Sequence, residues 1–283
     1  MPEPVGWYRQ DMSLTTTARR KARTAGDSPA LEKLTRAGLL GYGLLHLAVG
    51  WLALQIAHGR SARGDQSGAF RLLAGQPFGR VLVWAIAAGL VAMAIWQLFE
   101  AAVGHLDEQG GRRVLERVVS AGRTIAYGAL GATAIQVADG GDPATGSQQR
   151  EATSGVLGQP GGQWLVGAAG IAVTVVGLVL VVHGIRKGFV RNLRRNLMSA
   201  GEFQAAVRTG QLGYAGKGAV YAVAGVLVTI AAATFDPAKS AGLDGALHTL
   251  AQQPFGYALL LVAAAGFALF GVYCYFQARY RKV

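Results

Sequence analysis

The sequence predicts an all-α integral membrane protein whose six transmembrane helices form a pseudo-threefold bundle of three parallel two-helix repeats. The composition is the first reason: 52% of the 283 residues are hydrophobic, only 15% are charged, and the charges lie in blocks between long uncharged runs. The length of these runs is the second, since about 20 apolar residues in a helix cross a hydrocarbon core of about 30 Å. The third is a Gln-Pro-x-Gly sequence that occurs three times, each time between two apolar segments.

Residues 1–33 are polar and of mixed charge, with a basic cluster at residues 18–23. No apolar run with a small-residue cleavage site follows that cluster closely, so a signal peptide is not expected. We expect a disordered basic tail on the cytoplasmic side of the membrane.

Six apolar segments follow the tail, at residues 37–57, 78–102, 122–138, 164–183, 212–234 and 254–277. Taken in pairs, they divide the chain into repeats at residues 34–106, 114–190 and 207–283. The third segment is the weakest, because it is short and carries Thr124, Thr133 and Gln136. Polar side chains are tolerated in a membrane helix where neighbouring helices shield them, so we expect this helix to be covered.

The three Gln-Pro-x-Gly sequences are expected to begin the second helix of each repeat. Proline lacks the N–H that a first helical residue leaves unpaired, and the residue before proline is disfavoured in the helical region. The positions concerned are Gln76, Pro77, Gly79, Gln159, Pro160, Gly162, Gln253, Pro254 and Gly256. Before the first and third turns, residues 68–74 and 245–251 predict short amphipathic helices in the outer interface. The middle repeat has only a degraded version, at residues 154–157.

Lys and Arg side chains are distributed unevenly over the loops, and this distribution predicts the orientation. Twenty-one of the 27 lie in the N-terminal tail, in the connections after the second and fourth segments, and at the C-terminus. Both termini are therefore expected in the cytoplasm, with the net charge of +12 on the inner face. That charge favours contact with anionic lipid of the inner leaflet. Nucleic-acid binding is not expected, because no aromatic residues alternate with the basic ones.

The first helices of the repeats align through Gly43, Gly128 and Gly218, and the second helices align through their prolines. The third repeat opens with Gly-Tyr-Ala-x-x-Gly-x-x-Tyr at residues 213–221 and closes with Gln-Ala-Arg-Tyr-Arg at residues 277–281. Together with the Gln-Pro-Phe-Gly turn, this pattern resembles a bacterial membrane family catalogued as domain of unknown function 1206. The resemblance covers residues 33–282 as three tandem copies, and it implies the fold but no activity. The second copy departs from the pattern at Gly131 and Gly161.

Polar residues at membrane depth are the candidate site residues, because lipid cannot solvate them. One set lies 23 residues after each proline, about 35 Å along a helix and so near the inner boundary. A second set is aligned on the first helices at a similar level. The candidates are Glu100, His183, Gln277, Tyr42, Tyr127, Lys217 and Arg123. They predict either a cytoplasm-facing polar cluster around the pseudo-threefold axis or interfacial side chains that reach the head groups, and their nearness to the boundary favours the second.

His46 is the mid-membrane polar residue, about 14 Å into the first helix. A second histidine at the same depth, as a haem with two histidine ligands would need, is not found in the sequence. A neutral histidine hydrogen-bonded to a neighbouring helix is therefore favoured over a haem ligand or a proton relay.

No nucleophile, base and orienting residue recur at a usable spacing, and no Gly-rich run has the context of a phosphate loop, so neither an enzyme nor a cofactor is expected. Charge is nearly absent at mid-membrane depth, which argues against a solute pathway. The leading hypothesis is a structural or partner-binding module of the bacterial cytoplasmic membrane. Its expected partners are anionic lipid and another membrane protein or a second copy. The alternative is a small-solute or ion transporter or channel built around the pseudo-threefold axis.

Overall fold

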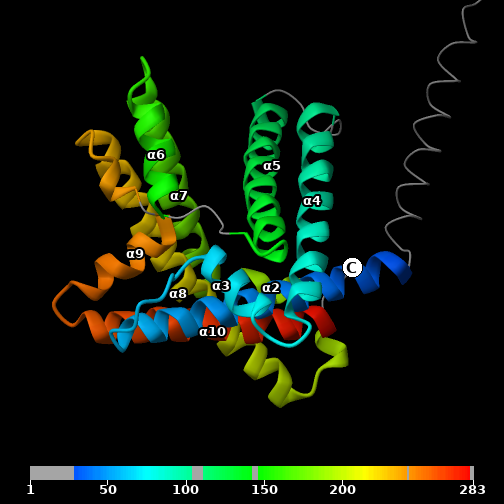
Figure 1. Cartoon of the computed structure of the whole chain (residues 1–283). Coiled ribbons are helices and arrows are strands. Elements are labelled where there is room, and N and C mark those ends of the chain that lie inside the picture. Colours follow the sequence, from blue (N-terminus) through cyan, green and yellow to red (C-terminus); the bar gives the residue numbers. More distant parts are fainter. Residues whose placement is uncertain (1–28, 104–110, 142–145, 241, 281–283) are drawn as a thin grey trace, which may run out of the picture.

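A computed structural model describes residues 29–103, 111–141, 146–240 and 242–280, and within them the regular elements are helical, as predicted (Figure 1). The tail predicted at residues 1–33 lies mostly outside the described residues, and the first of the described helices begins at Pro29. In chain order the α-helices are α2 (Pro29–Ala57), α3 (Gln66–Ala74), α4 (Gly79–Val103), α5 (Gly111–Ala138), α6 (Gly146–Leu157), α7 (Gly162–Ile185), α8 (Ala200–Ala233), α9 (Gly242–Ala251) and α10 (Gly256–Tyr280).

Five of the described helices are long and apolar enough to cross a membrane, namely α2 from Arg36 onward, α4, α7, α8 and α10. A multi-pass membrane protein is therefore supported. The predicted span at residues 122–138 forms the second half of α5, which is not among the five. Its threonine, glutamine and glycine residues lower the mean hydropathy, so the sixth span is not confirmed.

Each Gln-Pro-x-Gly sequence forms a β-turn ahead of the helix rather than the first turn of the helix. The glycine N–H donates to the glutamine carbonyl over 2.8 to 2.9 Å, and the second helices begin at these glycines. The residue after proline is left-handed in all three turns, as in a type II β-turn, with φ of 60°, 79° and 63° at Phe78, Gly161 and Phe255. The prediction that proline occupies the first helical turn is wrong, because this left-handed residue separates the proline from the helix.

A short helix precedes each of these turns. Helices α3 and α9 confirm the two short helices predicted there, and they pack inward through Phe70 and Leu247, whose side chains are fully buried. The degraded version expected in the middle repeat is wrong, because α6 is 12 residues long. Its Gln, Arg, Glu and Ala residues are good helix formers, and they lie upstream of the four residues on which the prediction rested.

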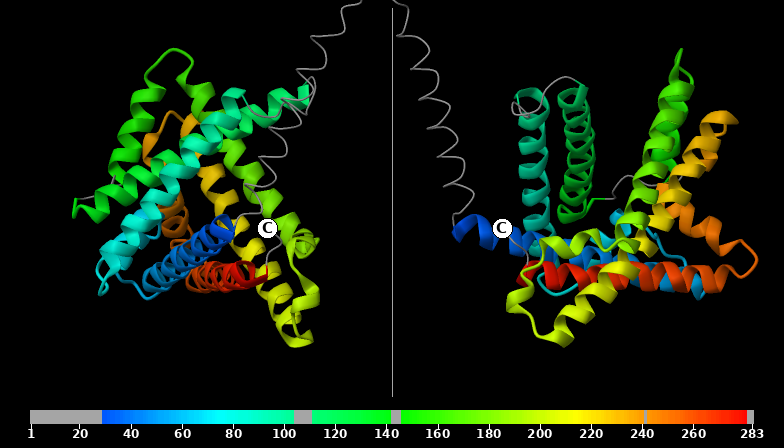
Figure 2. Two further views of the ribbon diagram at one scale, coloured as in Figure 1. Left: turned by 90° about the vertical axis from the view of Figure 1, so that its right-hand side faces the viewer. Right: turned by 180° about the vertical axis from the view of Figure 1, so that it is seen from behind.

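The long helices pack as three pairs, and each pair joins the second helix of one repeat to the first helix of another. Helix α4 packs on α5, α7 packs on α8, and α10, the last of the described helices, packs on α2, the first of them (Figure 2). The pairing is therefore cyclic, since the last repeat is joined to the first as each earlier repeat is joined to the next.

The α7/α8 and α10/α2 interfaces are one packing arrangement made twice. A Cβ added to Gly218 would lie 2.6 Å from the carbonyl oxygen of Gly177, and one added to the repeat-equivalent Gly43 would lie 2.9 Å from that of Gly271. Gly177 and Gly271 each stand 17 residues after the proline of their repeat. Glycine thus lets the backbones touch at the same place in both pairs.

The same match recurs two turns further along the first helices. A Cβ added to Gly225 would lie 2.7 Å from the carbonyl oxygen of Gly170, and one added to Gly50 would lie 2.9 Å from that of Ala264. Gly170 and Ala264 each stand ten residues after the proline. We call these two interfaces, each a line of glycine contacts, the glycine seams.

The α4/α5 pair lacks such a seam. A Cβ on Gly128, the counterpart of Gly43 and Gly218, would meet no atom within 4 Å, and Ala94 stands where the other pairs have glycine. The closest approach is at Gly131, where a Cβ would lie 3.2 Å from the Val91 side chain.

The three pairs run in different directions. Helices α2 and α10 lie along the base of the molecule in Figure 1 while α4 and α5 stand across them, and Figure 2 shows the same from two other sides. Helix α10 also packs on α8 of its own repeat, where a Cβ on Gly216 would lie 2.6 Å from the Cα of Gly266. The predicted bundle of six helices around one pseudo-threefold axis is therefore not confirmed.

Candidate functional site

A buried lysine lies where α2, α8 and α10 meet. Lys217 is 3% exposed, and its Nζ donates a hydrogen bond of 2.7 Å to the hydroxyl of Tyr42. The same nitrogen lies 4.2 Å from the ring centre of Phe270, 4.8 Å from that of Tyr42 and 5.3 Å from that of Tyr221. We call these four residues and His46 the Lys217 cluster.

Aromatic rings are the main surroundings of this amine. A cation over a ring face is attracted by the ring quadrupole, by about 2 kcal/mol when desolvated. No carboxylate lies within salt-bridge distance of Lys217 in the described part of the chain. An amine at membrane depth without an acidic partner is costly as a cation, so the Tyr42 hydroxyl and the three rings stabilise it.

His46 completes the cluster on α2. It is 4% exposed, and its Nδ1 lies 2.7 Å from the carbonyl oxygen of Tyr42 in the same helix, so the neutral ring carries its hydrogen on this nitrogen. Its ring centre is 4.3 Å from that of Tyr42 and 4.8 Å from that of Phe270. The hydrogen bond is made within the helix rather than to a neighbouring helix as predicted, because the carbonyl one turn earlier is within reach.

Two further hydrogen bonds join repeat 1 to repeat 3, one of them at Tyr221 of the cluster. Gln66 donates to the hydroxyl of Tyr221 over 3.4 Å, and the backbone N–H of Gly64 donates to Asp244 Oδ1 over 2.8 Å. The loop before α3 is thereby attached to α8 and α9.

Two of the seven residues predicted near the inner boundary are in direct contact in the structure. Tyr42 and Lys217 occupy aligned positions in repeats 1 and 3 and share the hydrogen bond described above. Tyr127, their counterpart in repeat 2, is half-buried on α5. The aligned first-helix positions of repeats 1 and 3 are therefore in contact.

The other four predicted residues do not form one cluster. His183 is half-buried at the end of α7, with its ring 5.0 Å from Tyr214, and Gln277 is 8% exposed near the end of α10. Glu100 is half-buried near the end of α4, and Arg123 is exposed on α5. Helices α4 and α10 belong to different helix pairs, and the C-terminal end of α4 lies far from α10 in Figure 1.

Phe270 and Cys274 are site residues that the sequence analysis missed. Both lie on the face of α10 that begins at Gly266, at successive steps of four residues. Because the second helices align through their prolines, Gly266 corresponds to Gly89 of the first repeat, and this spacing could have identified them. Cys274 is fully buried, with its Cβ 3.0 Å from the position of a Cβ on Gly43.

The connection between α7 and α8 is an ordered basic segment. It contains the 3₁₀ helices η1 (Gly188–Asn192) and η2 (Arg195–Leu197), and Phe189 anchors it at 1% exposure, stacked 5.4 Å from Tyr214. Its backbone is joined to α10 by a hydrogen bond of 2.7 Å from Arg194 N to Tyr280 O. The exposed basic side chains are Arg186, Lys187, Arg191 and Arg195.

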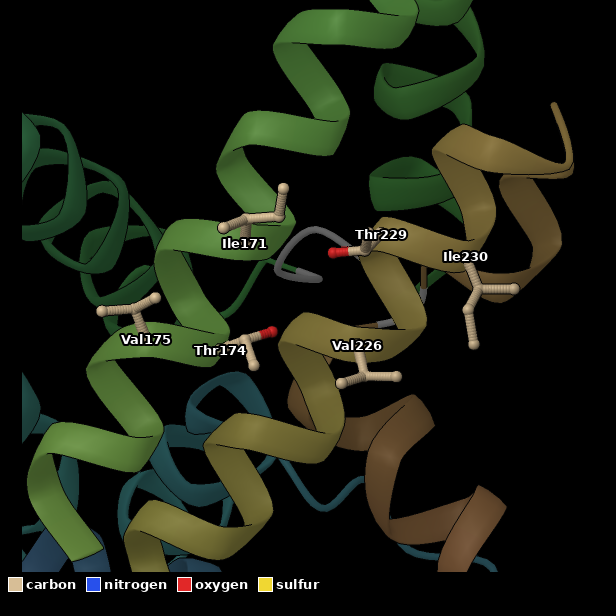
Figure 3. A pocket seen from close by; sticks show the side chains of 6 residues that line it. All are labelled: Ile171, Thr174, Val175, Val226, Thr229 and Ile230. Carbon is tan, nitrogen blue, oxygen red and sulfur yellow. The ribbon is translucent and has the colours of Figure 1, made fainter. Parts of the chain in front are cut away.

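A shallow groove of about 220 Å³ lies on the outside of the α7/α8 pair (Figure 3). Its lining is Ile171, Thr174, Val175, Val226, Thr229 and Ile230. The threonine hydroxyls donate to carbonyl oxygens of their own helices, those of Gly170 and Gly225, over 2.9 Å. The groove is therefore apolar and suits lipid rather than a polar solute.

Three stretches of the chain, residues 37–104, 118–187 and 212–281, match the family model described as Domain of Unknown Function (DUF1206). The chain is also 31% identical over 257 residues to an uncharacterized protein of Bacillus subtilis, YxxB. The aligned residues cover 90% of this chain and 93% of that protein. No solved structure matches.

Proposed function

This chain belongs to the DUF1206 family, whose description names no activity, and we propose that it is a structural or partner-binding module of the bacterial cytoplasmic membrane. Both termini face the cytoplasm in this proposal, because the basic loops lie on that side. The six long helices span as three cyclic pairs around a pseudo-threefold axis.

The two glycine seams are the observation that carries the proposal. Backbones in direct contact at Gly43 and Gly271, and again at Gly177 and Gly218, leave no room between the paired helices for a solute. Small residues at helix interfaces are how membrane proteins gain packing energy, since lipid provides no hydrophobic drive between helices. The glycine spacing shared by the α7/α8 and α10/α2 pairs would then serve assembly.

The Lys217 cluster is the observation that favours the alternative, a transporter or channel. An ionisable side chain at membrane depth, hydrogen-bonded to the aligned residue of another repeat, is a typical substrate or ion contact. In that case water would reach the cluster along the pseudo-threefold axis.

Cys274 distinguishes the two, because it is the single cysteine of the chain and lies beside the cluster. A packed seam predicts that a small water-soluble thiol reagent leaves Cys274 unmodified in native membranes and modifies it after denaturation in SDS. Modification in the membrane would support the transporter instead. In a Cys274→Ser background, Asp65→Cys should react with an impermeant reagent from outside and Arg194→Cys should not, which tests the orientation.

Anionic lipid is the partner that the inner face fits best. The α7–α8 connection presents Arg186, Lys187 and Arg191 next to the inner end of α7, at head-group depth, where each basic residue near an anionic surface contributes about 1 kcal/mol. Native mass spectrometry after extraction in a mild detergent should show retained anionic lipid or a protein partner. A bare monomer would count against this part of the proposal.

A further inference from the structure

Helix α4 presents a face that is open at Gly89 and Met93 and buried at Gln97. Gly89, Met93 and Gln97 follow one another at steps of four residues and so lie on one side of the helix. A Cβ on Gly89 would meet no atom within 4 Å, and Met93 is 43% exposed. The counterparts in the third repeat, at the same distances from the proline, are the buried residues Gly266, Phe270 and Cys274.

Helix α2 presents a matching open face at residues 38–42. A Cβ on Gly38 would meet no atom within 4 Å, and Tyr42 is 43% exposed. In the third repeat the same positions are occupied, since a Cβ on Gly213 would lie 2.5 Å from the backbone nitrogen of Phe270. The two long helices of the third repeat, α8 and α10, therefore pack on each other here, whereas α2 and α4 of the first repeat do not.

An unpaired acceptor and a hydroxyl hydrogen lie on these two faces. Gln97 is 8% exposed, yet its Oε1 has no hydrogen-bond partner. The Tyr42 hydroxyl accepts a hydrogen bond from Lys217, and no acceptor for its own hydrogen is found among the residues that the structure describes. A buried polar atom without a partner is destabilising, so a missing contact is indicated.

Repeat equivalence indicates that these two groups belong together. In the third repeat Lys217 Nζ lies 4.2 Å from the ring centre of Phe270, and Cys274 stands one helical turn after Phe270 on α10. Gln97 is the counterpart of Cys274, and Tyr42 is the counterpart of Lys217. Closing the first repeat as the third repeat is closed therefore brings Gln97 to Tyr42.

A lipid bilayer favours packing of α4 along α2. Helices α2 and α4 touch near Gly41, where a Cβ would lie 3.4 Å from the Ile86 side chain, and they run across each other in Figure 1. Both are long and apolar enough to span. Spanning helices tilt by about 20° on average, so two that lie across each other cannot both keep their apolar lengths in the hydrocarbon.

We propose that in the membrane the face of α2 at residues 38–42 is the binding surface for α4 of the same chain. Helix α4 turns about the Gly41 contact, so that Gly89 packs on Gly41 and Met93 packs on Gly38. The Tyr42 hydroxyl then donates to Gln97 Oε1. The resulting hydrogen-bond series, from Lys217 through Tyr42 to Gln97, joins α8, α2 and α4.

A disulfide tests the docked position. In a Cys274→Ser background, Gly38→Cys combined with Met93→Cys is oxidised in native membranes, and the linked peptide is measured by mass spectrometry. Two cysteines form a disulfide only when their Cα atoms come within about 7 Å. The matched control is Gly38→Cys with Ile95→Cys, because Ile95 lies at nearly the same depth on the opposite side of α4.

We expect on the order of tenfold more disulfide in the Met93 pair than in the Ile95 pair, given the geometric limit of about 7 Å. Equal yields, or no disulfide in either pair, would overturn the proposal. A disulfide found only between two chains would also overturn it, because α4 of a second copy would then occupy the surface.

The hydrogen bond from Tyr42 to Gln97 is tested by whether Gln97→Leu raises or lowers the thermal unfolding midpoint in lipid nanodiscs. If Gln97 Oε1 stays unpaired, Gln97→Leu removes a buried orphan and raises the midpoint. If Tyr42 donates to it, Gln97→Leu lowers the midpoint, and the loss disappears in a Tyr42→Phe background. A raised midpoint in the otherwise unchanged chain would refute the contact.

Discussion

The α7/α8 and α10/α2 seams share a backbone arrangement but differ in what surrounds it. Both have glycine 17 residues after the proline, packed on the aligned glycine of the first helix. Around the α10/α2 seam lie His46 and Lys217, together with Phe270 and Cys274 of α10. The α7/α8 seam has Val176 and Leu180 at the α7 positions that correspond to Phe270 and Cys274, and it opens to an apolar groove. The repeat thus specifies how helices pair, and the side chains added to one pair create a polar site.

Replacing the three aligned glycines by alanine should give the largest difference in unfolding free energy between the two glycine seams and the α4/α5 pair. Gly218→Ala and Gly43→Ala force a methyl group against a carbonyl oxygen, which should cost about 1–3 kcal/mol of unfolding free energy each. Gly128→Ala meets open space and should be neutral or stabilising by up to about 1 kcal/mol through helix propensity. Thermal unfolding in detergent measures all three variants. Similar losses of unfolding free energy at the three positions would show that α4 and α5 also pack through a glycine seam.

In the Lys217 cluster, replacing Tyr42 and replacing Lys217 should change the unfolding free energy by different amounts. Tyr42→Phe leaves the buried amine without its hydrogen-bond acceptor and should cost about 1–3 kcal/mol. Lys217→Met replaces the amine by an apolar side chain of similar length and should cost less, or stabilise the protein. The double variant should be close to Lys217→Met alone. If Lys217→Met were the more damaging change, the amine would have a partner that these contacts do not provide.

The smallest effects are expected at the turns, where the three repeats are most alike. Pro77, Pro160 and Pro254 are each the second residue of the same kind of β-turn, and each turn follows a complete short helix. Replacement by alanine should therefore cost about 0.4–1 kcal/mol at every site. The losses are read as shifts of the unfolding midpoint. A clearly smaller loss at Pro160 would indicate that the middle turn is less ordered than the outer two.

The turns also show how far sequence reasoning reaches. Gln76 and its two counterparts were expected to interrupt the helices, and they do, because the residue before proline avoids the helical region. The left-handed conformation of Phe78 and Phe255 could not be predicted, since bulky residues rarely adopt positive φ. Both rings are almost fully exposed, as aromatic residues of a membrane interface are.

The candidate site was predictable in part. Aligning the repeats placed Tyr42 and Lys217 at one level, and the structure joins them by a hydrogen bond. The alignment of the repeats did not predict that the Phe270 ring lies next to the Lys217 amine. Periodicity predicts the depth of a residue in the membrane and not the direction in which its helix faces. The directions of the three helix pairs were beyond reach for the same reason.

The α10/α2 seam has a consequence for biosynthesis. Gly43 emerges from the ribosome 228 residues before Gly271, so at roughly 5–20 residues per second α2 waits about 10–45 s for the helix that it packs on. The α7/α8 seam joins Gly177 to Gly218 and can form almost at once. During that interval α2 exposes the same glycine-lined surface to lipid, to α8 and to other nascent helices. The α10/α2 pair therefore forms only after α10 has been synthesised, and a chain stopped before residue 256 would leave α2 without this packing partner.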